Sequence, residues 1–280
     1  MNKVFDKKIC LITGANSGIG YATTMELAKL NANVVMVCRN KERGEPAQKE
    51  IIEKTGNKNV DLLLCDLSSL DSIRKLAAEF KTKYQNLHVL INNAGVMLSK
   101  REVSVDGFEM NFAVNHLAPF LLTNLLLDIL KKSAPSRIIN VASAAHKMGR
   151  IDFEDLQSEN KKHRFMGLYG DSKLALMLTS YELSRRLEGT GVTLNTIHPG
   201  VVNTKLGMDR SKPKKGIARR FFKSPEKGAE TSIYLASSPE VEGVTGKYFI
   251  NKQEQKSSED SYNNELAKSL WDITIQMTGL

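Results

Sequence analysis

Residues 9–20 read ICLITGANSGIG, an apolar run followed by three glycines, Gly14, Gly18 and Gly20. The run predicts a buried strand, and the amphipathic stretch from Ile19 onward predicts a helix. Glycines at such a junction allow a tight turn and let a diphosphate approach the helix N-terminus, where free N–H groups favour anions. The spacing Gly-x-x-x-Gly-x-Gly differs from the common Gly-x-Gly-x-x-Gly fingerprint, so these glycines alone are equally consistent with a structural turn.

Short apolar runs alternate with longer amphipathic stretches along the whole chain. The runs are continuously apolar, which is typical of strands buried on both faces of a sheet. They predict seven strands, at Ile9–Thr13, Asn33–Cys38, Val60–Cys65, Val89–Asn92, Arg137–Val141, Val192–His198 and Gly246–Ile250. Helical periodicity lies between them, at Ile19–Leu30, Lys41–Lys54, Asp71–Tyr84, Gly107–Lys131, Tyr169–Glu188 and Pro225–Ala236. This alternation predicts a single α/β domain over residues 1–280: a doubly wound (Rossmann) fold with a parallel seven-stranded sheet and helices on both faces.

Local signals place several helix ends and the tail of the chain. Asp71 and Ser72 are expected to cap the third helix, and Ser224 is expected to cap the helix that begins at Pro225. The polar tract Gln253–Asp260 predicts a loop. The tail Glu265–Met277 is amphipathic and is expected to pack on the body of the domain, with a partner-binding helix as the alternative.

The bulk composition is that of a soluble globular protein. The chain has 280 residues, of which 41% are hydrophobic and 25% charged, and its formal net charge is +9. A basic surface attracts nucleic acid, membranes or anionic ligands, but no dense basic block dominates, which favours a solvated lysine-rich surface. A nucleic-acid-binding function also lacks a basic helix or a stacking platform. The apolar stretch Leu117–Leu130 is too short to span a bilayer and no apolar leader opens the chain, so no transmembrane segment is expected.

Cysteines and histidines give no sign of a disulfide framework or a metal site. Cys10, Cys38 and Cys65 lie in or at the end of apolar runs without a Cys-x-x-Cys pair, so buried free thiols in the cytoplasm are expected. Metal-ligand spacing is absent among the histidines, and we expect no metal. The five are His88, His116, His146, His163 and His198.

The end of the second predicted strand bears on the choice of cofactor. Dinucleotide folds that use NAD usually place an acid there to bind the ribose 2′-hydroxyl. This chain has Arg39 instead, and a guanidinium can form two hydrogen bonds to a 2′-phosphate. Lys41 and Arg43 add positive charge, or are simply solvated. The sequence therefore favours NADP(H) over NAD(H).

An acid–base pair is suggested by Tyr169 and Lys173, which follow Ser143 by 26 and 30 residues. Residues four apart share one face of a helix, so the phenol and the amine can point into the same cleft. A free tyrosine is a poor base at neutral pH, and a nearby ammonium is expected to lower its pKa.

With these residues in place, the chain resembles the short-chain dehydrogenase/reductase family, and most closely its retinol dehydrogenase-like branch. The resemblance extends from about Lys8 to the C-terminus. It rests on Thr13–Gly20, Asp66-Leu67, Asn92-Asn93-Ala94-Gly95, Asn115, Ser143, Tyr169-x-x-x-Lys173, Pro199-Gly200, Leu270-Trp271-Asp272 and Thr278-Gly279-Leu280.

The resemblance implies a role for each matched residue. Catalytic roles fall on Asn115, Ser143, Tyr169 and Lys173: Tyr169 exchanges a proton with the substrate oxygen, Ser143 hydrogen-bonds that oxygen, Asn115 holds a water, and Lys173 binds the nicotinamide ribose. The implied cofactor-binding residues are Gly14, Asn16, Ser17, Gly18, Ile19, Gly20, Arg39, Asp66, Leu67, Asn93, Ala94, Gly95, Tyr169, Lys173, Pro199, Gly200, Val202 and Thr204.

The predicted function is an NADP(H)-dependent oxidoreductase that acts on a lipophilic aldehyde, ketone or alcohol, such as a retinal-like, steroid or xenobiotic compound. A regulatory protein that binds NADP(H) without catalysis is the alternative. Two variable segments, His146–Gly167 and Lys205–Ser224, are expected to form an extra loop and a substrate lid. The lid mixes apolar and basic residues, which suits a lipophilic substrate, weak contact with an anionic membrane or an exposed loop. Family members often form homodimers through the long helices, here Gly107–Lys131 and Tyr169–Glu188, although the extra loop would hinder this.

Overall fold

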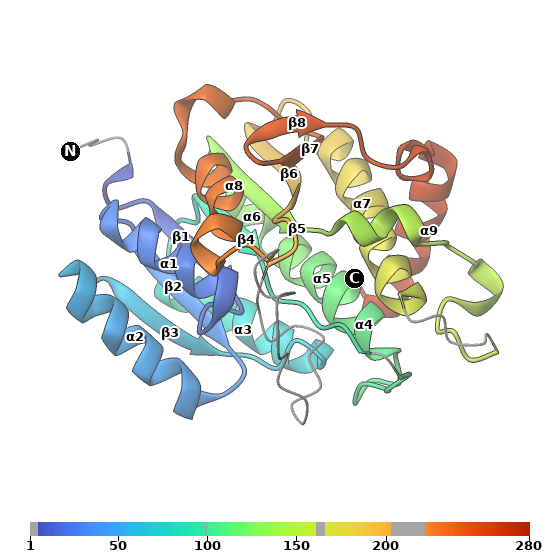
Figure 1. Cartoon of the computed structure of the whole chain (residues 1–280), viewed down its shortest axis with the longest axis horizontal. Coiled ribbons are helices and arrows are strands. Elements are labelled where there is room, and N and C mark those ends of the chain that lie inside the picture. The colour runs from blue at the N-terminus through green and yellow to red at the C-terminus, as the bar shows by residue number, and fades with distance from the viewer. Residues whose placement is uncertain (1–4, 99, 161–165, 203–221) are drawn as a thin grey trace.

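The computed structural model describes residues 5–98, 100–160, 166–202 and 222–280. Within them the chain forms a sheet with the strand order β3-β2-β1-β4-β5-β6-β7-β8, in which β1 to β7 are parallel and β8 is antiparallel to β7 (Figure 1). The strands are β1 (Ile9–Thr13), β2 (Asn33–Cys38), β3 (Val60–Leu64), β4 (Val89–Asn92), β5 (Ser136–Val141), β6 (Val192–His198), β7 (Lys247–Ile250) and β8 (Gln253–Gln255).

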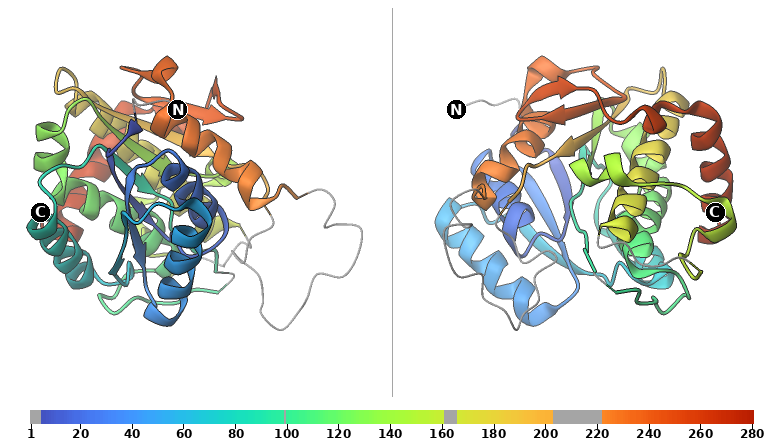
Figure 2. Two further views of the ribbon diagram at one scale, coloured as in Figure 1. Left: turned by 90° about the vertical axis from the view of Figure 1, so that its left-hand side faces the viewer. Right: turned by 45° about the vertical axis from the view of Figure 1, so that its right-hand side comes forward.

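Helices cover both faces of this sheet, and a hydrophobic core lies on each (Figure 2). One core contains side chains of α1 (Gly18–Lys29), α2 (Lys41–Thr55) and α8 (Pro225–Ser237). The other contains side chains of α3 (Leu70–Lys83), α5 (Ala118–Leu125), α6 (Leu127–Lys132) and α7 (Gly167–Arg186). The short helix α4 (Met110–Phe112) precedes α5, and α9 (Asn264–Thr278) lies against α7 on the outer side. The predicted doubly wound fold is confirmed.

The predicted strand number was one too low. Gln253–Asp260, expected to be a loop, contains strand β8 and a 3₁₀ turn at Glu259–Tyr262. A tight turn with positive φ at Asn251 and Lys252 reverses the chain after β7. All three residues of β8 are polar and exposed, so no apolar run marked the strand; it is held by backbone pairing with β7.

Two further helix predictions need correction, and one cap is confirmed. The predicted helix Gly107–Lys131 is interrupted: a π-helical turn at Ala113–Leu117 separates α4 from α5, and Leu126 separates α5 from α6. The cap of α3 is Ser69, whose hydroxyl accepts a hydrogen bond from Ser72 N, rather than Asp71 or Ser72. Ser224 caps α8 as predicted. All three cysteines are buried and free, as expected.

The strand order places a crevice where the sheet changes direction. From β1 the chain moves outward to β2 and β3, and it then returns to β4 on the other side of β1. Ligands of doubly wound sheets bind outside the carboxyl ends of the strands at such a switch point. Thr13, Asn92, Val141 and His198 end four adjacent strands at this edge.

Some sequence predictions fall outside the described residues. Thr204 is among them, as are residues 205–221 of the predicted lid and residues 161–165 of the predicted extra loop. Within the described ranges, none of the helices combines the length and apolar character that a bilayer crossing requires.

Candidate active site

The glycine turn after β1 leaves the N-terminus of α1 open. Gly14 and Gly18 have φ values of +66° and +57°, which favour glycine. A Cβ at Gly20 would overlap the carbonyl of Gly14, so only glycine lets α1 approach the turn this closely. Ser17 is the N-cap residue, yet within the described chain no side chain caps α1 and no acid lies in its first turn. An uncapped N-terminus with its positive dipole end fits the diphosphate of a dinucleotide.

Thr13 fastens the end of β1 to the end of β4. Its hydroxyl oxygen accepts hydrogen bonds from the backbone N–H groups of Asn93 (3.0 Å) and Ala94 (3.0 Å). Asn93 Nδ2 donates to the Thr13 carbonyl at 2.8 Å. The predicted Asn93–Gly95 segment therefore lies directly beside the glycine turn.

Arg39 and Asp66 follow the neighbouring strands β2 and β3 at the same edge. Arg39 is exposed, and within the described residues no ion pair involves it. Asp66 accepts hydrogen bonds from the N–H (3.0 Å) and hydroxyl (2.7 Å) of Ser68, so its carboxylate is held in its own turn. Leu67 and Ala94 line one small cavity, which places the predicted adenine and ribose residues close together.

Lys173 is a buried lysine at the centre of the site. Its side chain is 3% exposed and its Nζ donates to the carbonyl of Val141, the last residue of β5, at 2.8 Å. Burial lowers the pKa of Lys173 to about 7. An unpaired buried lysine is costly and is typical of functional sites.

Tyr169 and Ser143 lie beside this lysine. The Nζ of Lys173 is 5.7 Å from the centroid of the Tyr169 ring. Burial raises the pKa of Tyr169, and the nearby side chain of Ser143 offsets this in part. The expected lowering of this pKa by Lys173 was wrong for this arrangement, because the phenol is buried and the ammonium lies over the ring.

Asn115 reaches the same cluster from the π-helical turn. Its Oδ1 accepts from the N–H of Val96 at 2.8 Å, and its Nδ2 donates to the Val96 carbonyl at 2.9 Å and to Ser172 Oγ at 3.0 Å. A Cβ at Gly95 would lie 3.0 Å from Asn115 Oδ1 and 3.6 Å from Lys173 Nζ. The side chain of Asn115 therefore joins the extension of β4 to α7.

The segment after β6 closes the other side of the crevice. Pro199 and Gly200 follow His198, and Gly200 has a φ of +87°. A Cβ at Gly200 would meet the side chain of Lys223, and Val202 forms a bridge with Lys223. A Cβ at Gly228 of α8 would meet the side chains of Val202 and Ile19, so both side chains lie close to this glycine.

Comparison with known proteins identifies the family of this chain. A family model described as short chain dehydrogenase matches residues 8–215. The chain belongs to this family. The human protein named retinol dehydrogenase 13 is 45% identical over 281 residues, which cover 98% of this chain and 85% of that protein. This short-chain dehydrogenase is therefore an oxidoreductase of the retinol dehydrogenase-like branch.

Solved structures share the fold of this chain. An uncharacterised protein from Mycobacterium paratuberculosis aligns with a TM-score of 0.80 and 31% identity, covering 98% of this chain and 94% of that one. The Pseudomonas aeruginosa RhlG/NADP active-site complex aligns with a TM-score of 0.72 and 26% identity, covering 89% of this chain and 97% of that one. Proteins of this family bind NAD or NADP.

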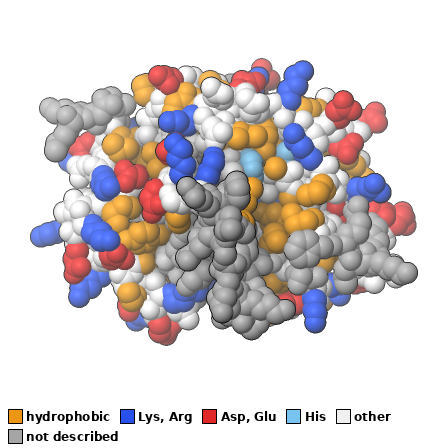
Figure 3. Space-filling model, in the orientation of Figure 1, with side chains coloured by type: hydrophobic (Ala, Val, Ile, Leu, Met, Phe, Trp, Pro, Cys, Tyr) orange, Lys and Arg blue, Asp and Glu red, His pale blue; other side chains and the backbone are white. Residues whose placement is uncertain are grey.

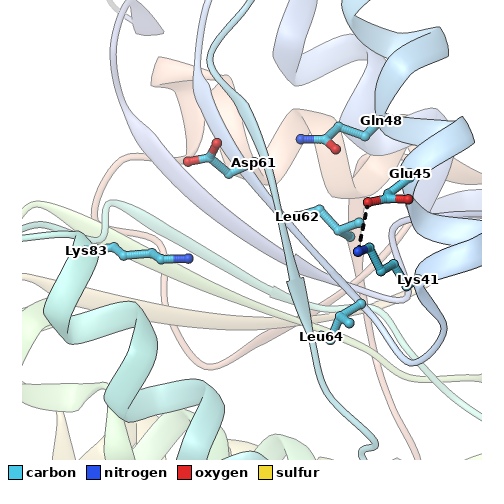
Figure 4. A pocket seen from close by; sticks show the side chains of 7 residues that line it. All are labelled: Lys41, Glu45, Gln48, Asp61, Leu62, Leu64 and Lys83. Atoms are coloured by element: carbon cyan, nitrogen blue, oxygen red, sulfur yellow. Dashed lines mark ion pairs between the residues drawn. The ribbon is translucent and has the colours of Figure 1, made fainter.

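The surface of this short-chain dehydrogenase has two further features of note. On the face seen in Figure 3, apolar side chains gather around histidine side chains. A polar pocket of about 490 Å³ lies elsewhere, at the outer edge of β3 (Figure 4), and none of the candidate catalytic residues lines it. An ion pair of 3.5 Å between Lys41 and Glu45 crosses its wall. This pocket is therefore distinct from the candidate active site.

Sequence reasoning missed several residues that shape the site. Thr13 was read only as part of the glycine motif, although its hydroxyl fixes the end of β4. Gly149 and Gly170 bring the turn after Ser143 against the start of α7, since a Cβ at Gly149 would overlap the Gly170 carbonyl. His146 was considered only as a metal ligand. Its position three residues after Ser143 was the available signal.

Proposed function

We propose that this protein is an NADP(H)-dependent oxidoreductase that transfers hydride between the nicotinamide and a lipophilic aldehyde, ketone or alcohol, with retinal-like compounds as the leading class. The buried cluster of Lys173, Tyr169 and Ser143 at the carboxyl edge of the sheet carries the proposal. A lysine this deeply buried has no evident structural need.

The residues of the cluster have separable tasks. Bound cofactor supplies hydride in reduction and accepts it in oxidation. Tyr169 Oη donates its proton to the carbonyl oxygen in reduction and receives it back in oxidation. Ser143 Oγ hydrogen-bonds the same oxygen as negative charge develops on it. Lys173 would bind the nicotinamide ribose hydroxyls through Nζ and so orient the cofactor beside Tyr169.

The preference for NADP(H) rests on the end of β2. Arg39 is exposed there and the segment from Val37 to Asn40 holds no acid. The neighbouring Asn40 caps α2 by accepting from Arg43 N at 3.0 Å, so its side chain is already engaged. Arg39 is thus placed to pair with a 2′-phosphate, which an acid would repel.

Lipophilic substrates are supported by the surface near the site and by the relative. Met148, Phe153 and Val201 are 50%, 39% and 61% exposed, and they lie in the segments that follow Ser143 and Gly200. Exposed apolar side chains in such loops suit an apolar ligand. Retinol dehydrogenase 13 is named for a compound of this kind.

Turnover of a panel of aldehydes, ketones, retinoids and steroids with NADPH tests the proposal. We expect loss of NADPH absorbance with at least one lipophilic carbonyl compound. Tyr169→Phe removes the proton donor and is expected to lower kcat by about 100-fold or more, with NADPH affinity retained. Tight NADPH binding without any turnover would favour the alternative, a non-catalytic NADP(H)-binding regulator.

A parallel series with NADH tests the cofactor preference. Arg39→Ala is expected to raise KM for NADPH by about 10-fold or more, the value of one charge-assisted pair, and to leave KM for NADH unchanged. Lys49→Ala is the matched control, because Lys49 is an exposed cation of α2 paired with Glu53. Equal effects on both cofactors would contradict a 2′-phosphate contact.

A further inference from the structure

His146 is a fully buried histidine that the proposed chemistry does not use. It lies in the 3₁₀ turn Ala144–Met148, which Ser143 caps by accepting from Ala145 N at 3.2 Å. Its ring packs edge-on against Tyr248 of β7, with the centroids 5.2 Å apart. The imidazole is therefore enclosed directly behind the candidate catalytic serine.

The hydrogen bonds of His146 define its protonation. The backbone N–H of Ser258 donates to His146 Nε2 at 3.0 Å, so Nε2 must be the unprotonated nitrogen. The proton is then on Nδ1, which lies 2.6 Å from the carbonyl oxygen of Ser143 and donates to it. Burial lowers the pKa of His146, which is consistent with this neutral form.

Ser258 lies in a turn of the C-terminal segment, and neighbouring residues of that turn contact α7. The hydroxyl of Ser257 bonds with Tyr181 Oη of α7 at 2.9 Å and with Ser261 Oγ at 2.6 Å. Ser261 Oγ donates to the Ser258 carbonyl at 2.5 Å, and the rings of Tyr181 and Tyr262 stack at 5.3 Å. The turn that carries Ser258 is thus anchored to the helix that carries Tyr169 and Lys173.

We propose that His146 is a positioning residue: its Nδ1–H holds the backbone of Ser143, and the Ser258 N–H of the C-terminal segment keeps the proton on that nitrogen. This inference rests on the proposed function. Because Ser258 is tied to α7, the bridge fixes Ser143 relative to Tyr169. A displacement of about 1 Å at such a group is worth about 100-fold in rate.

Two similar substitutions separate the two ends of the bridge. Asparagine at position 146 carries an amide N–H near the place of Nδ1 and retains a donor for the Ser143 carbonyl, but it cannot reach Ser258. Glutamine reaches Ser258 with its oxygen and loses the donor to Ser143. Since each variant breaks the bridge at one end, we expect His146→Asn and His146→Gln each to lower kcat about 10- to 100-fold, both with unchanged NADPH affinity. His88→Gln is the control, since His88 Nδ1 accepts from Ile9 N at 3.0 Å, at the start of β1 and at the opposite end of the strand from the carboxyl edge.

Amide hydrogen exchange provides a readout that needs no turnover. The Ser258 amide should exchange faster in His146→Asn than in wild type or in His146→Gln, because only the asparagine leaves it without an acceptor. Equal kcat in wild type and His146→Gln, or unchanged Ser258 exchange in His146→Asn, would overturn the inference. Absence of turnover in the wild-type protein would count against the proposed function alone, and the exchange measurement would still decide whether the bridge exists.

Discussion

Burial of Lys173, a residue of the candidate active site, lowers the stability of the folded protein at neutral pH. The Lys173 ammonium is removed from water, and among the residues that the structure describes it donates one hydrogen bond, to the Val141 carbonyl. Burial lowers its pKa from 10.5 to about 7, so the folded protein binds this proton less tightly than the unfolded chain does. For a base with a lowered pKa, stability is complete above pH 10.5 and falls as the pH drops toward 7. At neutral pH this lysine therefore destabilises the fold.

Lys173→Met is expected to make the protein more stable and inactive. A pKa difference between 10.5 and about 7 corresponds to about 5 kcal/mol, and the Val141 carbonyl left without a donor costs about 1–3 kcal/mol. We expect the free energy of unfolding at pH 7 to rise by about 2 kcal/mol, measured by urea denaturation. Lys173→Arg, which keeps a buried cation, serves as the comparison and should show no gain. A loss of stability in the methionine variant would contradict the burial cost.

His116 is a second residue whose burial has a measurable consequence. Its Nε2 is 3.0 Å from Thr274 Oγ1, which itself donates to the Leu270 carbonyl, so His116 is the donor and is neutral. Burial lowers the pKa of His116 from 6.5 to about 3. The unfolded chain therefore binds a proton below pH 6.5 that the folded protein does not, and stability falls as the pH falls from 6.5 toward 3.

The loss of stability at acid pH should be smaller in His116→Leu than in the wild-type protein. The wild-type protein should lose about 2 kcal/mol of unfolding free energy between pH 7 and pH 5 from this residue alone, and the variant should lack that share of the loss. Urea denaturation at both pH values measures the difference. The pH dependence of stability that remains in the variant comes from other groups. One of them is His198, since burial lowers the pKa of His198 to about 4. An unaltered pH dependence in His116→Leu would contradict the neutral buried state.

At the scale of elements, the contact between the 3₁₀ turn Ala144–Met148 and α7 sets the distance between Ser143 and Tyr169. Gly149 ends the turn and Gly170 lies in the first turn of α7, with no room for a side chain between them. A Cβ on Gly149 would also lie 2.8 Å from Leu174 Cβ. The φ of Gly149 is −73°, which any residue adopts, so space alone requires glycine here.

Gly149→Ala should therefore lower kcat without unfolding the protein. The added methyl group must push the turn away from α7, and we expect kcat to fall about 10-fold or more with little change in NADPH affinity. Lys147→Ala is the neighbouring control, because Lys147 is exposed and its truncation leaves the contact intact. Steady-state kinetics and the melting temperature are compared for both. A fully active Gly149→Ala would show that the turn accommodates the shift.

The elements that the sequence predicted best are those with a strong apolar pattern. The strands β1, β2, β4 and β6 have the predicted bounds, because each is a continuous apolar run between turns. The π-helical turn at Ala113–Leu117 was missed, since its residues have the same apolar pattern as an α-helix. Strand β8 was missed because its three side chains are polar and exposed, so no apolar run marks it. The positions of the candidate site residues at the carboxyl edge followed from chain order and parallel strands, whereas the His146 bridge depends on residues 112 positions apart in sequence.

At the scale of the whole molecule, α9 covers part of the helical face through which members of the family often pair. Leu174, Ala175 and Leu178 of α7 pack with Ala267 and Leu270 of α9. Trp271 packs against Phe120 of α5 with centroids 4.7 Å apart, and Arg186 lies 4.4 Å over its ring. The chain itself thus buries apolar surface that a partner subunit would need.

We expect that the protein does not dimerise through this face and is a monomer. Size-exclusion chromatography with light scattering should give the mass of one chain, 31.2 kDa. Trp271→Ala should loosen α9 and lower stability by about 3–5 kcal/mol, the usual cost of truncating a buried tryptophan. Ser237→Ala, in α8 on the other face of the sheet, is the control. A stable dimer that survives dilution and is disrupted by charged substitutions on α7 would contradict this expectation.

Strand β8 has a consequence for the protein in concentrated solution. The sheet ends in three polar residues, and Glu254 pairs with Lys247 at 3.0 Å. An edge this short and hydrophilic offers little adhesive surface to a neighbouring molecule, so it guards against fibril-like stacking. In concentrated solution the β8 edge of one molecule should therefore not pair with the sheet of the next molecule.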